Sequence, residues 1–320
     1  MPLGAAKHSI RSAKVRQYPP RIDGRRLGRF VNMDAQVTDS VTHRKVQYML
    51  AILGIDAAWT LTQPSGVALV AKHSTGWRLM AAEPSYQHFL ARTDRSLLAE
   101  ERPSGSPPDA SALLASAAML SGGAIDLVAV DMPLARSPIV ERRFSDNKVS
   151  RAYGGRKCGT HSPNATRPGR MSDDLNQRFK REGYPLQTIA FKTPGLIEVY
   201  PHPTLVELAD AKERLPYKAS KVGAYWPKLK PPERRARLYQ QWDEIVDLLE
   251  GEIAGVAVAL PRLGLDASGV KLKACEDALD AIVCAWVGIC ALEGRAKPFG
   301  DENSAIWIPI PGATTANAPL

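Results

Sequence analysis

Acidic residues stand beside several apolar segments of the chain, where a fold could gather them. Asp56 and Asp131 each close a short apolar run, Glu198 lies within a third, and Asp277 and Asp280 are three apart in a long apolar stretch. That spacing makes the last two neighbours on one helix surface. Converging carboxylates repel one another unless a cation neutralises them, and their hard oxygens suit Mg²⁺ or Mn²⁺. Two such ions about 4 Å apart could hold the attacking and leaving oxygens of a phosphodiester displacement.

Each of these acids also has an ordinary structural interpretation. An aspartate at a strand end is often a turn or cap residue, and Glu198 could face solvent from an alternate strand position. Two acids in the first turn of a helix compensate its dipole. On a helical wheel, Asp280 lies at the border of the apolar stripe and Asp277 further out, whereas Glu276 lies closer. Glu276 is therefore an alternative to Asp277 as a ligand.

Positive charge is concentrated in two segments of the chain. The whole sequence has 42 Lys and Arg against 33 Asp and Glu, a net charge of +9. Residues 1–48 have ten bases and three acids, and residues 141–193 have twelve bases and five acids, so each segment carries +7. A basic segment within an otherwise acidic body predicts a phosphate-bearing partner, and we expect a nucleic acid. The candidate phosphate-binding residues are Arg142, Arg143, Arg151, Arg156, Lys157, His161, Lys218 and Lys221.

His202 lies between two prolines, directly after the segment that contains Glu198. It could donate a proton to a leaving group, and a structural histidine packed between the prolines is the alternative. The sequence has no phosphate-loop motif, dinucleotide-binding fingerprint, Gly-x-Ser-x-Gly or His-Glu-x-x-His.

The elements that must position these residues follow from the apolar pattern. Strands are expected at 48–56, 66–70, 77–82, 125–131, 196–200 and 305–310. Helices are expected at 204–215, 233–250 and 275–293, and at both ends of 96–121, where a loop at 103–108 interrupts and Asp109 caps the second half. Three consecutive strands followed by alternating helices and strands predict an α/β fold with a mixed five-stranded sheet flanked by helices. The basic segment 136–195 is too long for an ordinary connection and is predicted to be an insertion.

The domain organisation predicted from these patterns is one folded domain between two tails. Residues 1–46 lack apolar periodicity and are expected to be a disordered basic tail, residues 47–312 form the domain, and residues 313–320 are a C-terminal tail. A wrongly assigned start upstream of Met33 or Met49 is an alternative account of the first segment. No run of about 18 apolar residues occurs, so we expect no membrane partner. Four scattered cysteines without a Cys-x-x-Cys favour reduced thiols and a cytoplasmic location.

The motifs in their order resemble those of the domain of unknown function 429 family. They are 53–59 (LGIDAAW), 128–133 (VAVDMP), 157–164 (KCGTHSPN), 198–203 (EVYPHP), Tyr217-Lys218 with Lys221 and Gly223, and 276–280 (EDALD). The match runs from about residue 50 to 310. Members of that family are described as predicted ribonuclease H-like nucleases, a superfamily in which three antiparallel strands lead an αβαβα series.

The resemblance implies a divalent-metal-dependent nuclease. By position, Asp56, Asp131 and Asp280 match the metal-binding acids, and Asp277 or Glu198 is the fourth carboxylate. Asp56 would bridge two metals, and Glu198 or Asp277 would orient water. The alternatives are an ATPase-like or kinase-like protein that binds a small phosphorylated ligand or nucleotide on the same fold, and a binding module that has lost its chemistry.

Overall fold

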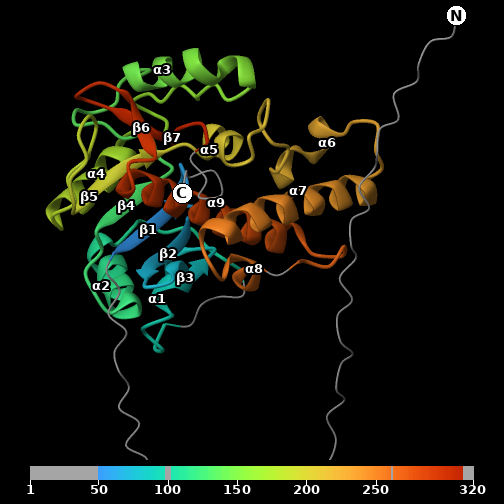
Figure 1. Ribbon diagram of the computed structural model, residues 1–320, viewed down its shortest axis with the longest axis horizontal. Coiled ribbons are helices and arrows are strands. Elements are labelled where there is room, and N and C mark those ends of the chain that lie inside the picture. The colour runs from blue at the N-terminus through green and yellow to red at the C-terminus, as the bar shows by residue number, and fades with distance from the viewer. Residues whose placement is uncertain (1–49, 98–101, 261, 313–320) are drawn as a thin grey trace, which may run out of the picture. The chain divides into compact units, whose positions relative to one another are not determined.

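The computed structural model describes residues 50–97, 102–260 and 262–312 (Figure 1). The predicted tails 1–46 and 313–320 lie outside these ranges, as does part of the expected helical segment 96–121. The described strands are β1 (Ala51–Asp56), β2 (Gly66–His73), β3 (Gly76–Glu83), β4 (Leu127–Val130), β5 (Gly195–Val199), β6 (Ala296–Gly300) and β7 (Ala305–Pro309). The α-helices are α1 (Tyr86–Leu90), α2 (Ala110–Ser121), α3 (Phe144–Tyr153), α4 (Arg170–Arg181), α5 (Pro201–Leu208), α6 (Val222–Tyr225), α7 (Pro231–Glu252), α8 (Val256–Ala259) and α9 (Gly269–Leu292). Short 3₁₀ turns occur at Gly154–Arg156 and Ala219–Lys221.

The strands form one mixed sheet in the order β3-β2-β1-β4-β5-β7-β6. The pairs β1–β2, β2–β3 and β6–β7 are antiparallel, whereas β1–β4, β4–β5 and β5–β7 are parallel. The predicted mixed α/β class is confirmed, but the sheet has seven strands in the described residues and not five. The unpredicted β6 (AKPFG) lies at the edge, where a proline and a lysine are tolerated because one side of the strand needs no partner.

Several predicted element boundaries differ from those of the structure. Helix α5 begins at Pro201 and ends at Leu208 instead of continuing to 215, and the chain turns at Asp210, whose φ is 46°. Helix α9 begins six residues earlier than expected because Ser268 caps it by accepting the Lys271 N–H. The predicted Asp109 cap of α2 is confirmed, since its side chain accepts the Ala112 N–H. The insertion 136–195 contains the helices α3 and α4.

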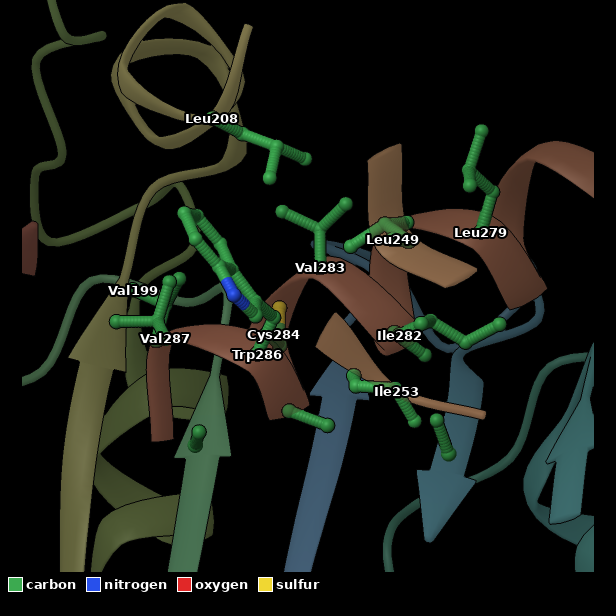
Figure 2. Close-up of a cluster of buried hydrophobic side chains, with 14 of the residues drawn as sticks. Val199, Leu208, Leu249, Ile253, Leu279, Ile282, Val283, Cys284, Trp286 and Val287 are labelled. Atoms are coloured by element: carbon green, nitrogen blue, oxygen red, sulfur yellow. The ribbon is translucent and has the colours of Figure 1, made fainter. Parts of the chain in front are cut away.

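The two faces of the sheet are covered by separate apolar clusters. On one face, α9 packs across β1, β2 and β4, with α7 and α5 beside it (Figure 1). Figure 2 shows Ile282, Val283 and Trp286 of α9 gathered with Leu249 of α7 and Leu208 of α5. On the opposite face, α1, α2 and α4 cover the same strands. The sheet is therefore buried on both sides, and an acid at a strand end lies next to a helix layer.

Glycines allow α9 to approach the sheet closely. A Cβ on Gly54 would lie 2.2 Å from the Ala281 carbonyl oxygen, and one on Gly66 would lie 2.0 Å from the Asp277 carbonyl oxygen. Both distances are far below van der Waals contact, so any side chain at these positions would push the helix away. The close approach brings the first half of α9 against the end of β1, where Asp56 lies.

Candidate functional site

Asp56 and Asp131 end neighbouring parallel strands at the same edge of the sheet. The two strands pair from Ile52 with Leu127 to Ile55 with Val130, and the Asp131 N–H donates to the Ile55 carbonyl at 2.9 Å. Since alternate residues of a strand point to opposite faces, Asp56 shares the face of Ile52 and Asp131 that of Leu127. Both apolar residues belong to the cluster beneath α9. The two carboxylates therefore point toward the α9 layer.

Helix α9 supplies three more carboxylates, and all of them are buried. Glu276 is 4 % exposed, Asp277 1 % and Asp280 0 %. The helical wheel placed Asp277 outside the apolar stripe, but the close approach of β1 and β2 covers that side of the helix as well. Glu276 accepts the Ala219 N–H at 2.6 Å, which leaves it tied to the 217–221 segment. Asp280 accepts a 2.8 Å hydrogen bond from the Tyr217 hydroxyl.

Two lysines reach the carboxylates of α9. Lys218 is bonded to Asp280, and its Nζ lies 3.5 Å from Glu276 Oε1. Lys273 is bonded to Asp277, and its Nζ lies 3.7 Å from the same Glu276 oxygen. The other oxygen of Asp277, Oδ2, is buried without a hydrogen-bond partner. Lys218, expected to contact phosphate, is instead held by the acids.

Crowding and burial perturb the acid cluster of Asp56, Asp131, Glu276, Asp277 and Asp280. Burial and the Asp280 charge raise the pKa of Asp56 from 3.8 to about 6, against the opposing charges of Lys218 and Lys273. Burial, followed by the charges of Asp56 and Asp280, raises the pKa of Asp131 well above its usual range. The pKa of Asp277 is also raised, by burial and then by Asp56. The fold therefore holds mutually repelling carboxylates together at a cost in free energy.

The donor chemistry of this acid cluster fits a divalent cation. Hard carboxylate oxygens in excess over the two ammonium groups, and the unpartnered Asp277 Oδ2, match what Mg²⁺ or Mn²⁺ would bind. Within the described ranges, however, no three Asp, Glu, His or Cys side chains already surround one point as a metal site would require. Cation binding here would therefore have to displace the lysine ammonium groups from the carboxylates.

Glu198 does not join this cluster. Its neighbour Ile197 belongs to the cluster beneath α9, so Glu198 points to the opposite face of β5. There Arg143 binds both of its oxygens, at 2.6 and 2.7 Å, and the Leu134 N–H donates to one of them at 2.7 Å. This saturated carboxylate has no free position from which to orient water, which argues against the role expected for it. Of the alternatives for the fourth carboxylate, Asp277 is the one placed beside Asp56.

Arg143 is a buried structural residue and not a phosphate ligand. Its five N–H donors are used by Glu198, by Asp146 through Nε and Nη2, and by the Leu134 carbonyl. Burial lowers the pKa of the guanidinium, but the Glu198 charge and the hydrogen bonds from Glu198 and Asp146 outweigh it and raise the pKa overall. Contact with a phosphate would require this network to break, so the expected role is wrong for Arg143 in this arrangement.

Three other basic candidates are also held by protein partners. Arg142 donates to the carbonyls of Thr160 and His161 and to the hydroxyls of Ser150 and Ser162, which fixes the 160–162 loop. Arg156 pairs with Glu207 at 2.6 Å, and Lys157 with Glu213 at 2.7 Å. Arg151 and Lys221 are exposed and lie outside the cleft described next. Most of the charge in the basic segment thus stabilises the insertion.

A cleft of about 430 Å³ opens beside the acid cluster. Asp131 and Lys218 line it, as do Trp59, His161 and Arg167. Trp59 and Arg167 were not predicted as site residues, although Trp59 falls in the motif around Asp56 and Arg167 in the basic segment. Of the expected phosphate ligands, His161 is the exposed one that faces this cleft.

His202 also lines the cleft, but it is only 9 % exposed. Its ring lies edge-on to Tyr200 and Tyr217, with centroids 5.4 and 5.6 Å away, and its Nδ1 has no hydrogen-bond partner. Burial, then the charges of Arg214 and Lys218, lower its pKa well below the usual value of 6.5. A histidine that is neutral near pH 7 is poorly suited to donate a proton, so the general-acid role is disfavoured.

Fold and site together define a mixed α/β domain whose strand ends and longest helix gather buried carboxylates beside a cleft. The chain belongs to the family described as protein of unknown function (DUF429), whose sequence profile matches residues 54–305. Comparison with curated proteins and with solved structures gave no match. None of the helices in the described ranges combines the length and apolar character needed to cross a lipid bilayer.

Proposed function

We propose that the protein is a divalent-metal-dependent nuclease of ribonuclease H-like fold that hydrolyses phosphodiester bonds of DNA or RNA. The strand order supports the fold assignment, because the antiparallel β1, β2 and β3 lead a series of parallel strands with β4 and β5 beside β1. The observation that carries the proposal is the burial of Asp56, Asp131, Asp277 and Asp280 around one sheet edge.

In this proposal Asp56, Asp131 and Asp280 hold the cations, and Asp277 is the fourth carboxylate. Bound divalent cations would supply Lewis-acid stabilisation of phosphoryl oxygens and a more acidic water. Lys218 and Lys273 neutralise the carboxylates when no cation is bound. Arg167 and His161, at the exposed wall of the cleft, are the cationic or polar groups available to a phosphate.

The test is cleavage of labelled single-stranded and duplex DNA and RNA by the full chain, with Mg²⁺, with Mn²⁺ and with a chelator. We expect cleavage that the chelator abolishes and that falls at least a hundredfold in Asp131→Asn and Asp280→Asn. Asp174→Asn, at an exposed position of α4, is the matched control and should cleave normally. Full activity in Asp131→Asn, or no cleavage of any substrate by the unmodified protein, would overturn the proposal.

The size of the cleft favours a second candidate, a protein that binds a small phosphorylated ligand. A volume of about 430 Å³ falls within the range of small-molecule sites, roughly 300–1,000 Å³. Protein–DNA interfaces typically bury about 1,000–2,500 Å² of protein surface, and Arg142, Arg143 and Arg156 are occupied by protein partners. A thermal shift with ATP and Mn²⁺, but with no oligonucleotide, would favour this candidate.

A further inference from the structure

Trp59 forms an aromatic wall on one side of the cleft. Its indole packs against the apolar cluster beneath the second face of the sheet, so one side of the residue is supported by the core. The guanidinium of Arg167 lies 5.8 Å from the ring centroid, and the His161 ring meets it edge-on at 6.0 Å. Arg167 and His161 are both exposed, so their positions over the indole can be taken by a ligand.

The loop that carries these two residues is held in place by its own hydrogen bonds. Arg142 ties residues 160–162 to α3, as described above. The Asn164 side chain accepts the N–H groups of Thr166 and Arg167, each at 2.9 Å, which fixes the turn before Arg167. The wall is thus preorganised, and binding would order few additional groups.

The same cleft has the acid cluster at its other end. Asp131 and Lys218 line it together with Trp59 and Arg167, so one ligand can touch the aromatic wall and the carboxylates at once. An aromatic ring beside a guanidinium is the combination that stacks an unpaired base and holds its phosphate. A paired base offers no free face to the indole.

We propose that this cleft binds one unpaired nucleotide, with its base against Trp59 and its phosphate held by Arg167 and His161. The inference rests on the proposed function and narrows its substrate class to single-stranded or frayed nucleic acid. Stacking of the base replaces the guanidinium over the indole and frees Arg167 for the phosphate. A blunt duplex cannot enter without unpairing its terminal base.

Binding is measured by fluorescence anisotropy with the full-length Asp131→Asn protein in Mg²⁺, so that the probes stay intact. The probes are fluorescein-labelled (dT)₈ and (rU)₈, which separate DNA from RNA, and a blunt DNA hairpin. We expect the hairpin to bind at least tenfold more weakly than the better single strand. Trp59→Leu should weaken single-strand binding about tenfold, or about 1.4 kcal/mol, whereas Trp59→Phe keeps a ring and should lose threefold or less.

Arg167→Gln should weaken single-strand binding and lower its salt dependence by about one phosphate contact. Arg237→Gln, at an exposed position of α7, is the matched control and should change neither. The proposal is overturned if the hairpin binds as well as the single strands, if neither strand binds, or if Trp59→Leu binds normally while its melting temperature is native. Should Trp59→Leu fail to fold, Arg167→Gln decides by the same criteria.

These outcomes are separable from those of the nuclease proposal. If the unmodified protein cleaves nothing while the Trp59 and Arg167 variants lose single-strand binding, the nuclease proposal fails and the nucleotide site stands. If cleavage depends on Asp131 and the Trp59 and Arg167 variants bind normally, the nuclease stands and this site is refuted.

Discussion

Replacement of Asp56 by asparagine should stabilise the metal-free protein while removing metal binding. The pKa of Asp56 rises from 3.8 to about 6 in the folded state, mainly because of burial and then because of Asp280. A carboxyl group of this kind binds its proton more tightly when the protein is folded, so stability present below pH 3.8 is lost as the pH rises through 6. Asparagine has nearly the same shape and no charge.

The size of the effect follows from the pKa change. Each pKa unit corresponds to about 1.36 kcal/mol, so ionised Asp56 costs the fold about 3 kcal/mol at pH 8. Asp56→Asn should therefore unfold about 3 kcal/mol less readily than the natural chain at pH 8 in a chelator, and about equally readily at pH 4. For a domain of this size the corresponding rise in melting temperature is roughly 5–10 °C.

The assay is urea unfolding at pH 4, 6 and 8 in a chelator, repeated with excess Mn²⁺. Mn²⁺ should stabilise the natural chain and leave Asp56→Asn unchanged, because a ligand stabilises only a folded state that binds it. Asp174→Asn, at an exposed position, should follow the natural chain at every pH. If Asp56→Asn is no more stable than the natural chain at pH 8 without metal, the account of the repelling acid cluster is wrong.

Three further predictions concern the surroundings of the site. Arg143→Met leaves Glu198 and Asp146 as buried, uncompensated charges and should cost about 3–5 kcal/mol in urea unfolding; a loss below about 1 kcal/mol would contradict the saturated network. Gly66→Ala should lower the melting temperature and weaken Mn²⁺ binding in calorimetry, since its Cβ would collide with Asp277 of α9, while Gly123→Ala, with open space around it, should do neither. His202→Gln should lose less stability than the natural chain between pH 7 and 5, because the lowered pKa of His202 makes the natural fold lose stability as the pH falls below 6.5; identical pH profiles would refute this.

The parts of the site that depend on local pattern were predictable from the sequence. Asp56 and Asp131 end apolar runs that form neighbouring parallel strands, and such ends meet at one edge. The face of Glu198 was not readable, because β5 is buried on both sides and its flanking residues are apolar in either direction. The wheel argument misplaced Asp277 because it assumed one buried stripe, whereas α9 is covered around most of its circumference.

The partners of the arginines could not be predicted, because they come from distant parts of the chain. Glu198 is 55 residues from Arg143, and Glu207 is 51 residues from Arg156. A signal for the unpredicted helices was present, since Val149 and Tyr153 in α3, and Leu175 and Phe179 in α4, repeat at a spacing of four. Read together with those spacings, the basic segment would have looked like folded structure with internal ion pairs.

Helix α9 provides both the central packing of the domain and the acids of the site, and it lies far from β1 in the chain. During synthesis, β1 and β4 leave the ribosome long before α9, so Asp56 and Asp131 wait without their partners while the apolar face of the sheet is uncovered. A nascent chain that ends before Gly269 can therefore have neither a complete acid cluster nor a complete core. Whatever chemistry the site performs is withheld until the same helix has closed the domain, and a chain truncated by a premature stop would be a client for chaperones or proteases and not an uncontrolled enzyme.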